Sequence, residues 1–226
     1  WGVPQLAAAV AAAGLLTGFV AVERRIPEPM LPPGLFAGRG FTVAVTVGFC
    51  LNVSFFGQLF VLSLFFQRTL GHDAWEAGLA LAPQACSAVV AAPLGGRVAA
   101  RFGVFPAMLM GLVLGAAGFA GTAFIGSGTA PLVVSGVTFA AGFGMAFAMP
   151  AATAAAVSAV PDELAGTAGG VVNAARQTGS VAGVAILGGV VAADASPSGF
   201  RVAMLMAAGI FVVAAALVAA AARDPA

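Results

Sequence analysis

The chain has no lysine, no tyrosine, one histidine and two cysteines among its 226 residues. Without a lysine it cannot form the Schiff base that a retinal-type light sensor needs. Two thiols and one imidazole do not make a metal site, and the apolar segments carry no Ser/His or paired-Asp constellation. We therefore expect no metal, no cofactor and no enzymatic activity. The lone His72 is interpreted as a solvated loop residue beside Asp73.

Charge is also scarce, because only 8% of the residues are charged whereas 61% are hydrophobic. A soluble domain has about a quarter of its residues charged. No charge occurs between Arg101 and Asp162, which leaves room for two membrane spans of about 20 residues. The net charge of +1 indicates no nucleic-acid partner. The composition predicts an all-α protein that crosses the lipid bilayer several times.

Seven apolar segments are each long enough to cross a hydrocarbon core of about 30 Å. They lie at residues 5–22, 41–66, 76–97, 104–126, 131–157, 165–192 and 202–222. The stretch 23–40, rich in Pro and Arg, is interpreted as an interfacial linker. The first segment follows Trp1 without a basic region or a cleavage site, so we do not expect it to be a signal peptide. We expect this chain to be part of a longer polypeptide.

The arginines predict the orientation of the spans. With residue 1 outside, the outer loops hold only Arg68 and Arg201. The inner loops then hold the six residues Arg24, Arg25, Arg39, Arg97, Arg101 and Arg223. This distribution satisfies the positive-inside rule, and the opposite orientation violates it.

Polar side chains are distributed unevenly among the last six spans. The third of these spans holds only Thr122, and the sixth, 202–222, holds no polar side chain. Every third span is thus almost wholly apolar, as expected for a helix that lies outermost against lipid. The pattern predicts one six-helix bundle of three plus three spans, the kind of internal repeat found in transporters.

The fifth of the six spans carries a polar face. Asn173, Arg176, Gln177 and Ser180 fall on one side of a helix because their spacings are three, four and seven. A guanidinium at that depth costs roughly 2.5 kcal/mol or more unless it faces protein, water or a ligand. Arg176 is therefore either satisfied locally, by backbone carbonyls or Gln177, or faces a substrate cavity or an acid elsewhere in the protein.

Other intramembrane amides are candidates for the same cavity, namely Asn52, Gln58 and Gln84. Amides of this kind also bond simply to a neighbouring helix, for about 1 kcal/mol. Both interpretations remain open. The pairs Gly111/Gly115 and Gly179/Gly183 are predicted to be close-packing seams between helices.

Several motifs resemble one known family. Gly96-Arg-Val-Ala-Ala-Arg-Phe-Gly103, between two spans, resembles the inner-loop motif of the major facilitator superfamily, although Ala100 replaces its usual acid. Further segments of this chain resemble the carboxy-terminal half of the family's fourteen-span branch, which contains EmrB/QacA-like drug:proton antiporters. These are Glu23-Arg-Arg25, Pro32-Pro-Gly-Leu-Phe36, Gly142 to Pro150, Pro161-Asp-Glu-Leu-Ala-Gly166, and Asn173-Ala-Ala-Arg-Gln-Thr-Gly179 with Gly183.

The resemblance implies a division of the chain and a function. Residues 1–22 would be the eighth span of the intact protein, 23–40 a cytoplasmic linker, and 41–226 the carboxy-terminal six-helix bundle. The intact protein would export lipophilic drugs or other small organic compounds across the bacterial inner membrane by alternating access. Protons would drive the export. No titratable group lies at mid-depth in this chain, so the coupling carboxylate is expected in the missing amino-terminal half.

Two interpretations of the inner-loop motif remain. Arg97 and Arg101 either only orient the protein by the positive-inside rule, or form a cytoplasmic latch that pairs with a carboxylate or a helix C-terminus. Gly96 and Gly103 would permit the tight turn that the latch needs.

The alternatives to a transporter half are a seven-helix membrane receptor and a non-transporting accessory subunit. Seven spans with an outer amino end match a receptor. The three-plus-three polarity and the inner-loop motif favour the transporter.

Overall fold

The computed structural model describes residues 11–12, 14–15, 17–18, 21–23, 25–26 and 33–223. The chain divides into two compact units, Trp1–Ala37 and Gly38–Ala226. In the first unit the described residues from 11 to 23 are helical, and the 3-10 helix η1 covers Pro33–Ala37. Most of the predicted span 5–22 lies outside the described residues.

The second unit has six α-helices and no strand within its described residues. They are α2 (Arg39–Arg68), α3 (Ala74–Phe102), α4 (Val104–Thr122), α5 (Pro131–Ser158), α6 (Ala165–Ala193) and α7 (Pro197–Arg223), with the 3-10 helix η2 (Asp162–Leu164) before α6. The turns between them are short. This is the all-α fold that the composition predicted.

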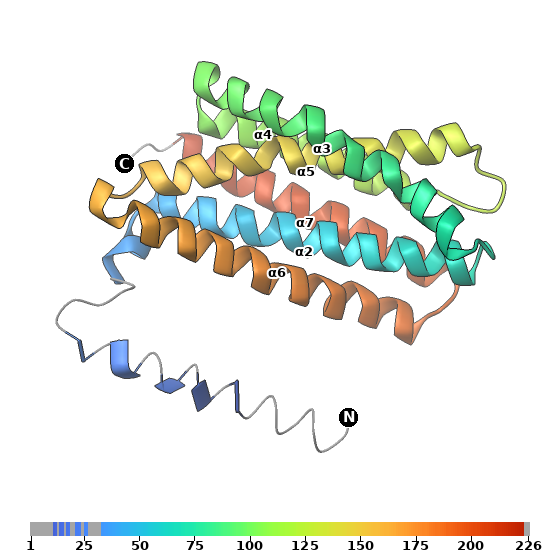
Figure 1. Ribbon diagram of the computed structural model, residues 1–226, viewed down its shortest axis with the longest axis horizontal. Coiled ribbons are helices and arrows are strands. Elements are labelled where there is room, and N and C mark those ends of the chain that lie inside the picture. Colours follow the sequence, from blue (N-terminus) through green and yellow to red (C-terminus); the bar gives the residue numbers. More distant parts are fainter. Residues whose placement is uncertain are drawn as a thin grey trace. The chain divides into compact units, whose positions relative to one another are not determined.

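The six helices form two layers (Figure 1). Four of them lie side by side in the order α3, α5, α2, α6, and α4 and α7 pack behind them. α4 packs mainly on α5, and α7 packs mainly on α4 and α2. One face of the bundle, formed by α3, α5, α2 and α6, is therefore not covered by α4 or α7. We call this face the four-helix face.

The packing repeats between the two triplets α2–α4 and α5–α7. α2, the first helix of its triplet, packs most closely on α6, the second helix of the other triplet. α5, the first helix of the second triplet, likewise packs on α3, although it packs as closely on α4, and the two third helices, α4 and α7, contact each other. This is the three-plus-three arrangement that the polarity of the spans predicted.

Glycines allow the closest of these contacts. A Cβ atom at Gly179 would lie 2.5 Å from the carbonyl oxygen of Phe49, and Gly183 lies against the backbone of Val53 in the same α2–α6 seam. Gly111 and Gly115 of α4 approach α5, and a Cβ at Gly111 would lie 2.7 Å from the carbonyl oxygen of Gly144. Both predicted glycine pairs are packing seams.

The third helices of the triplets have apolar outer surfaces. Their exposed large side chains include Met110, Val113 and Leu114 on α4 and Val202, Leu205, Met206, Val212, Val213 and Leu217 on α7. Thr122 is buried and donates to the carbonyl oxygen of Phe119 in its own helix. Apart from Thr122 and the terminal residues Ser198, Arg201 and Arg223 of α7, the polar side chains of the bundle lie in the other four helices.

Five helices in the described residues are long and apolar enough to cross a membrane, namely α2, α3, α4, α5 and α7. α6 is not among them, although its 29 residues span about 43 Å. Asn173, Arg176 and Gln177 lower its hydropathy. The sequence therefore predicts the α6 span from the length and the apolar flanks of this segment. The polar face of α6 needs shielding from lipid.

Three predicted boundaries are wrong. The span predicted to end at residue 126 ends at Thr122, and two other helices are longer than predicted. The span predicted to end at residue 97 continues as α3 through Phe102, so most of the inner-loop motif is helical. The span predicted to start at residue 202 begins at Pro197, because proline is well accommodated in the first turn of a helix. Hydropathy marks the apolar part of a helix, and both helices extend beyond it.

Candidate substrate passage

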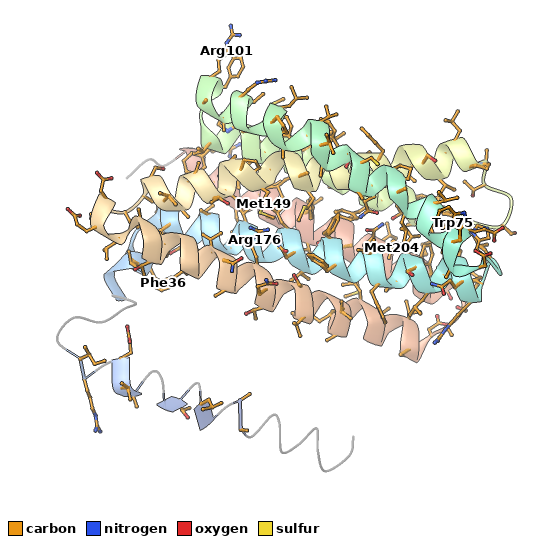
Figure 2. All side chains as sticks on the ribbon, in the orientation of Figure 1. Phe36, Trp75, Arg101, Met149, Arg176 and Met204 are labelled. Carbon is orange, nitrogen blue, oxygen red and sulfur yellow. The ribbon has the colours of Figure 1, made fainter. Side chains whose placement is uncertain are left out.

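Arg176 lies on α6 where this helix packs on α2 (Figure 2). Its stem lies against Gly48 of α2, where a Cβ would be in van der Waals contact with Cγ of Arg176 at 3.5 Å and a larger side chain would meet the stem. The side chain is half-buried. Its Nε atom is buried and has no hydrogen-bond partner in the described part of the chain. No acid pairs with this guanidinium within residues 33–223.

Ser180, one turn further along α6, links this site to α2. Its hydroxyl lies 3.3 Å from Oδ1 of Asn52 and 3.0 Å from the carbonyl oxygen of Arg176, and it can donate to either. Asn52 is only 2% exposed and donates from Nδ2 to the carbonyl oxygen of Gly48 at 3.0 Å. Asn52 is thus fixed by both helices, next to the stem of Arg176.

Asn173 and Gln177 of α6 are exposed, whereas Arg176 is half-buried. The three residues share one side of the helix, as their spacing predicted. They form an amide-rich strip with the guanidinium at its edge.

Gln58 and Gln84 form a separate pair deep in the bundle. Nε2 of Gln84 donates to Oε1 of Gln58 at 2.8 Å, and Nε2 of Gln58 lies 3.4 Å from Oε1 of Gln84. Gln58 is fully buried and Gln84 is 2% exposed. The structure therefore does not bring these two residues into the strip on α6. Whether they or Asn52 contact a substrate stays a prediction.

The polar residues of α2 bond to three different helices. Asn52 accepts from α6 and Gln58 bonds to α3, while Ser54 donates to the carbonyl oxygen of Ala207 in α7 at 3.0 Å. α2 is therefore the central helix of the polar network. The sequence indicated polar side chains on this helix but not their separate partners.

The four residues of the inner-loop motif lie at the end of the bundle where α3 gives way to α4. Arg97 and Arg101 are both exposed, and Figure 2 shows Arg101 pointing away from the helices. Its guanidinium carbon lies 5.3 Å from the ring centroid of Phe102. Neither arginine forms an ion pair with an acid in residues 33–223. The latch stays a prediction.

The two glycines of this motif differ. Gly103 has φ of +96° and forms the whole turn between α3 and α4. Gly96 lies inside α3, and a Cβ there would meet nothing within 4 Å. The expectation that Gly96 takes part in the turn is wrong, because the helix continues for six residues beyond it.

His72 lies in the loop between α2 and α3, as expected, but it is half-buried and not fully solvated. Its ring stacks on Phe66 with centroids 5.8 Å apart. Its Nδ1 atom is buried and has no partner in the described part of the chain. The neighbouring Asp73 does not bond to it but caps α3, where Asp73 and Glu76 form a reciprocal capping box.

Comparison with known proteins identifies relatives over most of the chain. The family model of the Major Facilitator Superfamily matches residues 2–184. The methylenomycin A resistance protein of Streptomyces coelicolor is 38% identical over 182 residues, which cover 80% of this chain and 38% of that protein. The tetracenomycin C resistance and export protein of Streptomyces glaucescens is 33% identical over 81% of this chain and 34% of its own length.

A third relative matches almost the whole chain. The methylenomycin A resistance protein of Bacillus subtilis is 30% identical over 225 residues, which cover 96% of this chain and 47% of that protein. The chain thus spans less than half the length of each of these three relatives.

Proposed function

Because this chain belongs to the Major Facilitator Superfamily, we propose that it forms the carboxy-terminal half of a secondary active transporter that exports lipophilic drugs or other small organic compounds. Two of its relatives are named for resistance to an antibiotic and one for resistance and export. The chain matches 34 to 47% of the length of these proteins. This coverage supports a half-transporter in a multi-pass membrane protein, and the resemblance of the motifs to the fourteen-span branch supports that branch.

The observation that carries the proposal is the unpaired guanidinium of Arg176. It lies on α6, one of the helices of the four-helix face, and no acid in residues 33–223 neutralises it. A half-buried charge in a membrane helix needs a counter-charge, water or a ligand. We propose that Arg176 faces the passage between the two halves, with Asn173 and Gln177 as neighbouring hydrogen-bonding groups for the substrate.

The division of the chain follows from the same proposal. Residues 1–22 are the eighth span, 23–40 are a cytoplasmic linker, and 41–226 are the carboxy-terminal bundle. The amino-terminal half would dock on the four-helix face, and the two halves would rock about the passage. A seven-helix receptor gains no support from the relatives, all three of which are named for antibiotic resistance.

Proton coupling requires a carboxylate that changes its charge within the passage. The acids of residues 33–223 lie outside the helix centres: Asp73 and Glu76 begin α3, Asp162 and Glu163 lie in η2, and Asp194 follows α6. We therefore place the coupling carboxylate in the amino-terminal half. Arg176 is its candidate partner when no substrate is bound.

Resistance assays test this function. The intact gene, expressed in a susceptible host, is expected to raise the inhibitory concentration of methylenomycin A or tetracenomycin C, and a protonophore is expected to abolish the export. Arg176→Gln is expected to lower the resistance about tenfold, which corresponds to about 1.4 kcal/mol. Arg176→Lys, which keeps the charge, is expected to retain part of it.

Arg201→Gln is the matched control, because it also removes one arginine from the bundle, but at a position away from the α2–α6 contact. Arg201 donates to the carbonyl oxygen of Ala123 and lies over Phe124, away from α6. All variants are compared at equal amounts of membrane-inserted protein. Full resistance in the Arg176→Gln variant removes Arg176 from the passage, and a protonophore-insensitive export refutes proton coupling.

A further inference from the structure

A groove of about 600 Å³ opens along α2, between α6 and the first turn of α7. Its walls include Phe60 and Leu64 of α2, Gly188 and Val191 of α6, and Phe200 of α7, and Arg68 lies at its end. We call it the α6–α7 groove. Ligand pockets in proteins have volumes of about 300–1,000 Å³, so the groove has the size of a binding site.

The walls of this groove are aromatic and ordered. Phe200 stacks on Phe65 with ring centroids 3.9 Å apart and planes inclined by 16°. Phe60 is 40% exposed and forms one edge of the groove. Gly188 keeps this edge open, because a Cβ there would lie 2.9 Å from Cε1 of Phe60. Any side chain at position 188 would push the Phe60 ring or fill the groove.

The charge in this groove lies at one end. Arg68 is the last residue of α2, is exposed, and makes no hydrogen bond or ion pair within the part of the chain that the structure describes. Thr69 and Ser196 line the groove at the same end. Leu64 and Phe60 lie four and eight residues before Arg68 on α2, which is about 6 and 12 Å deeper in the helix direction.

The acid in the turn between α6 and α7 is already engaged. Asp194 accepts a hydrogen bond from the backbone N–H of Ser196 and another from the hydroxyl of Ser198, each at 3.0 Å. It does not line the groove. Arg68 is therefore the charged group that a ligand in the groove would meet.

We propose that the α6–α7 groove binds one anionic phospholipid with a single phosphate, such as phosphatidylglycerol. An acyl chain would lie along Phe60 and Val191, and the phosphodiester would bind Arg68 and the hydroxyls at the membrane surface. The order of charged and apolar residues along the groove favours this ligand. A charge at the end of a membrane helix lies at headgroup depth, and the apolar walls continue into the acyl region.

Native mass spectrometry of the intact, delipidated protein tests this proposal. Phosphatidylglycerol and phosphatidylethanolamine with identical acyl chains are titrated separately. The wild-type protein is expected to bind phosphatidylglycerol about tenfold more tightly. Arg68→Gln is expected to remove this preference. Gly188→Val is expected to weaken the binding of both lipids about tenfold, because it obstructs the acyl-chain wall.

Two matched variants serve as controls. Arg201→Gln removes one arginine at the same end of the bundle but outside the groove, and Gly209→Val adds the same side chain on α7 where nothing lies within 4 Å. Both are expected to keep the wild-type affinities. If Gly188→Val does not fold, the smaller change Gly188→Ala replaces it. The rise in melting temperature that each phospholipid causes is then compared between this variant and the wild type.

Three results would each overturn the proposal. The wild-type protein could show no preference for phosphatidylglycerol. Arg201→Gln could lose as much preference as Arg68→Gln, which would indicate attraction by overall charge. A dimer that disappears in the Gly188 variants would show that a second copy of the protein, and not a lipid, occupies the groove.

Discussion

Gln58 and Gln84 bond to each other through both of their side-chain amides, in the buried space between α2 and α3. Because neither side chain reaches water, each amide depends on the other for its partners. Removing one partner leaves the other buried and unsatisfied, which costs about 1–3 kcal/mol, whereas replacing both by apolar groups of similar shape is close to neutral.

We therefore expect Gln84→Met and Gln58→Met each to lower the melting temperature, and the double variant to be more stable than either single variant. Thermal unfolding of the four proteins in one detergent measures this. Additive losses in the double variant would show that the two amides act independently.

The α2–α6 seam predicts a second effect. Gly183→Ala places a Cβ against the backbone of Val53, so α2 and α6 must separate, at a cost of about 1–3 kcal/mol. Gly209→Ala on α7 meets nothing within 4 Å and gains helix propensity, about 1 kcal/mol at most. The two substitutions are expected to shift the melting temperature in opposite directions. A Gly183→Ala protein as stable as the wild type would mean that the seam is loosely packed.

Gly103 and Gly96 provide a third comparison. Gly103 has φ of +96° and ψ of +161°, a region that is essentially restricted to glycine and costs other residues about 1–3 kcal/mol. Gly96 is helical and has open space around it. We expect Gly103→Ala to destabilise the protein and Gly96→Ala to leave its melting temperature unchanged or higher. Equal losses in both would indicate that the motif needs small residues and not a special backbone conformation.

The turn between α6 and α7 predicts a dependence on pH. Hydrogen bonds from Ser196, and then from Ser198, hold the pKa of Asp194 below its ordinary value. A lowered pKa means that the carboxylate stabilises the turn above the ordinary aspartate pKa, and that this contribution disappears as the pH falls through the folded-state value. Melting temperatures of the wild type and of Asp194→Asn are expected to converge below about pH 4. A difference that stays constant well below that pH would exclude the carboxylate as the cause.

The order and length of the spans followed from the sequence because lipid restricts the choices to helices that bury their own backbone bonds. The apolar composition of 104–126 and 202–222 correctly indicated the third helix of each triplet. The ends of α3 and α7 did not follow, because Arg97, Arg101 and Pro197 are compatible with helix beyond the apolar stretch.

The partners of the buried polar groups were harder to predict. Gln58 and Gln84 lie ten residues from the two helix ends that flank one short turn, and this equal spacing was a signal for their pairing in an antiparallel hairpin. Asn52, Ser54 and Gln58 are close in sequence but bond to three different helices. Only the packing of α2 determines which helix each side chain reaches. His72 carried no such signal, because its burial depends on a stacking contact with Phe66.

Gly48 has a consequence for how the substrate range of the proposed transporter could change. The absence of a side chain at this position lets the long stem of Arg176 lie flat on the adjacent helix, so the location of the positive charge is determined by a residue that has no polar atoms of its own in its side chain. A bulky replacement at position 48 would lift the charge toward the opening, and alanine would hardly move it. Under the proposed function, a substitution on α2 would then alter substrate selectivity while the arginine itself remained unchanged.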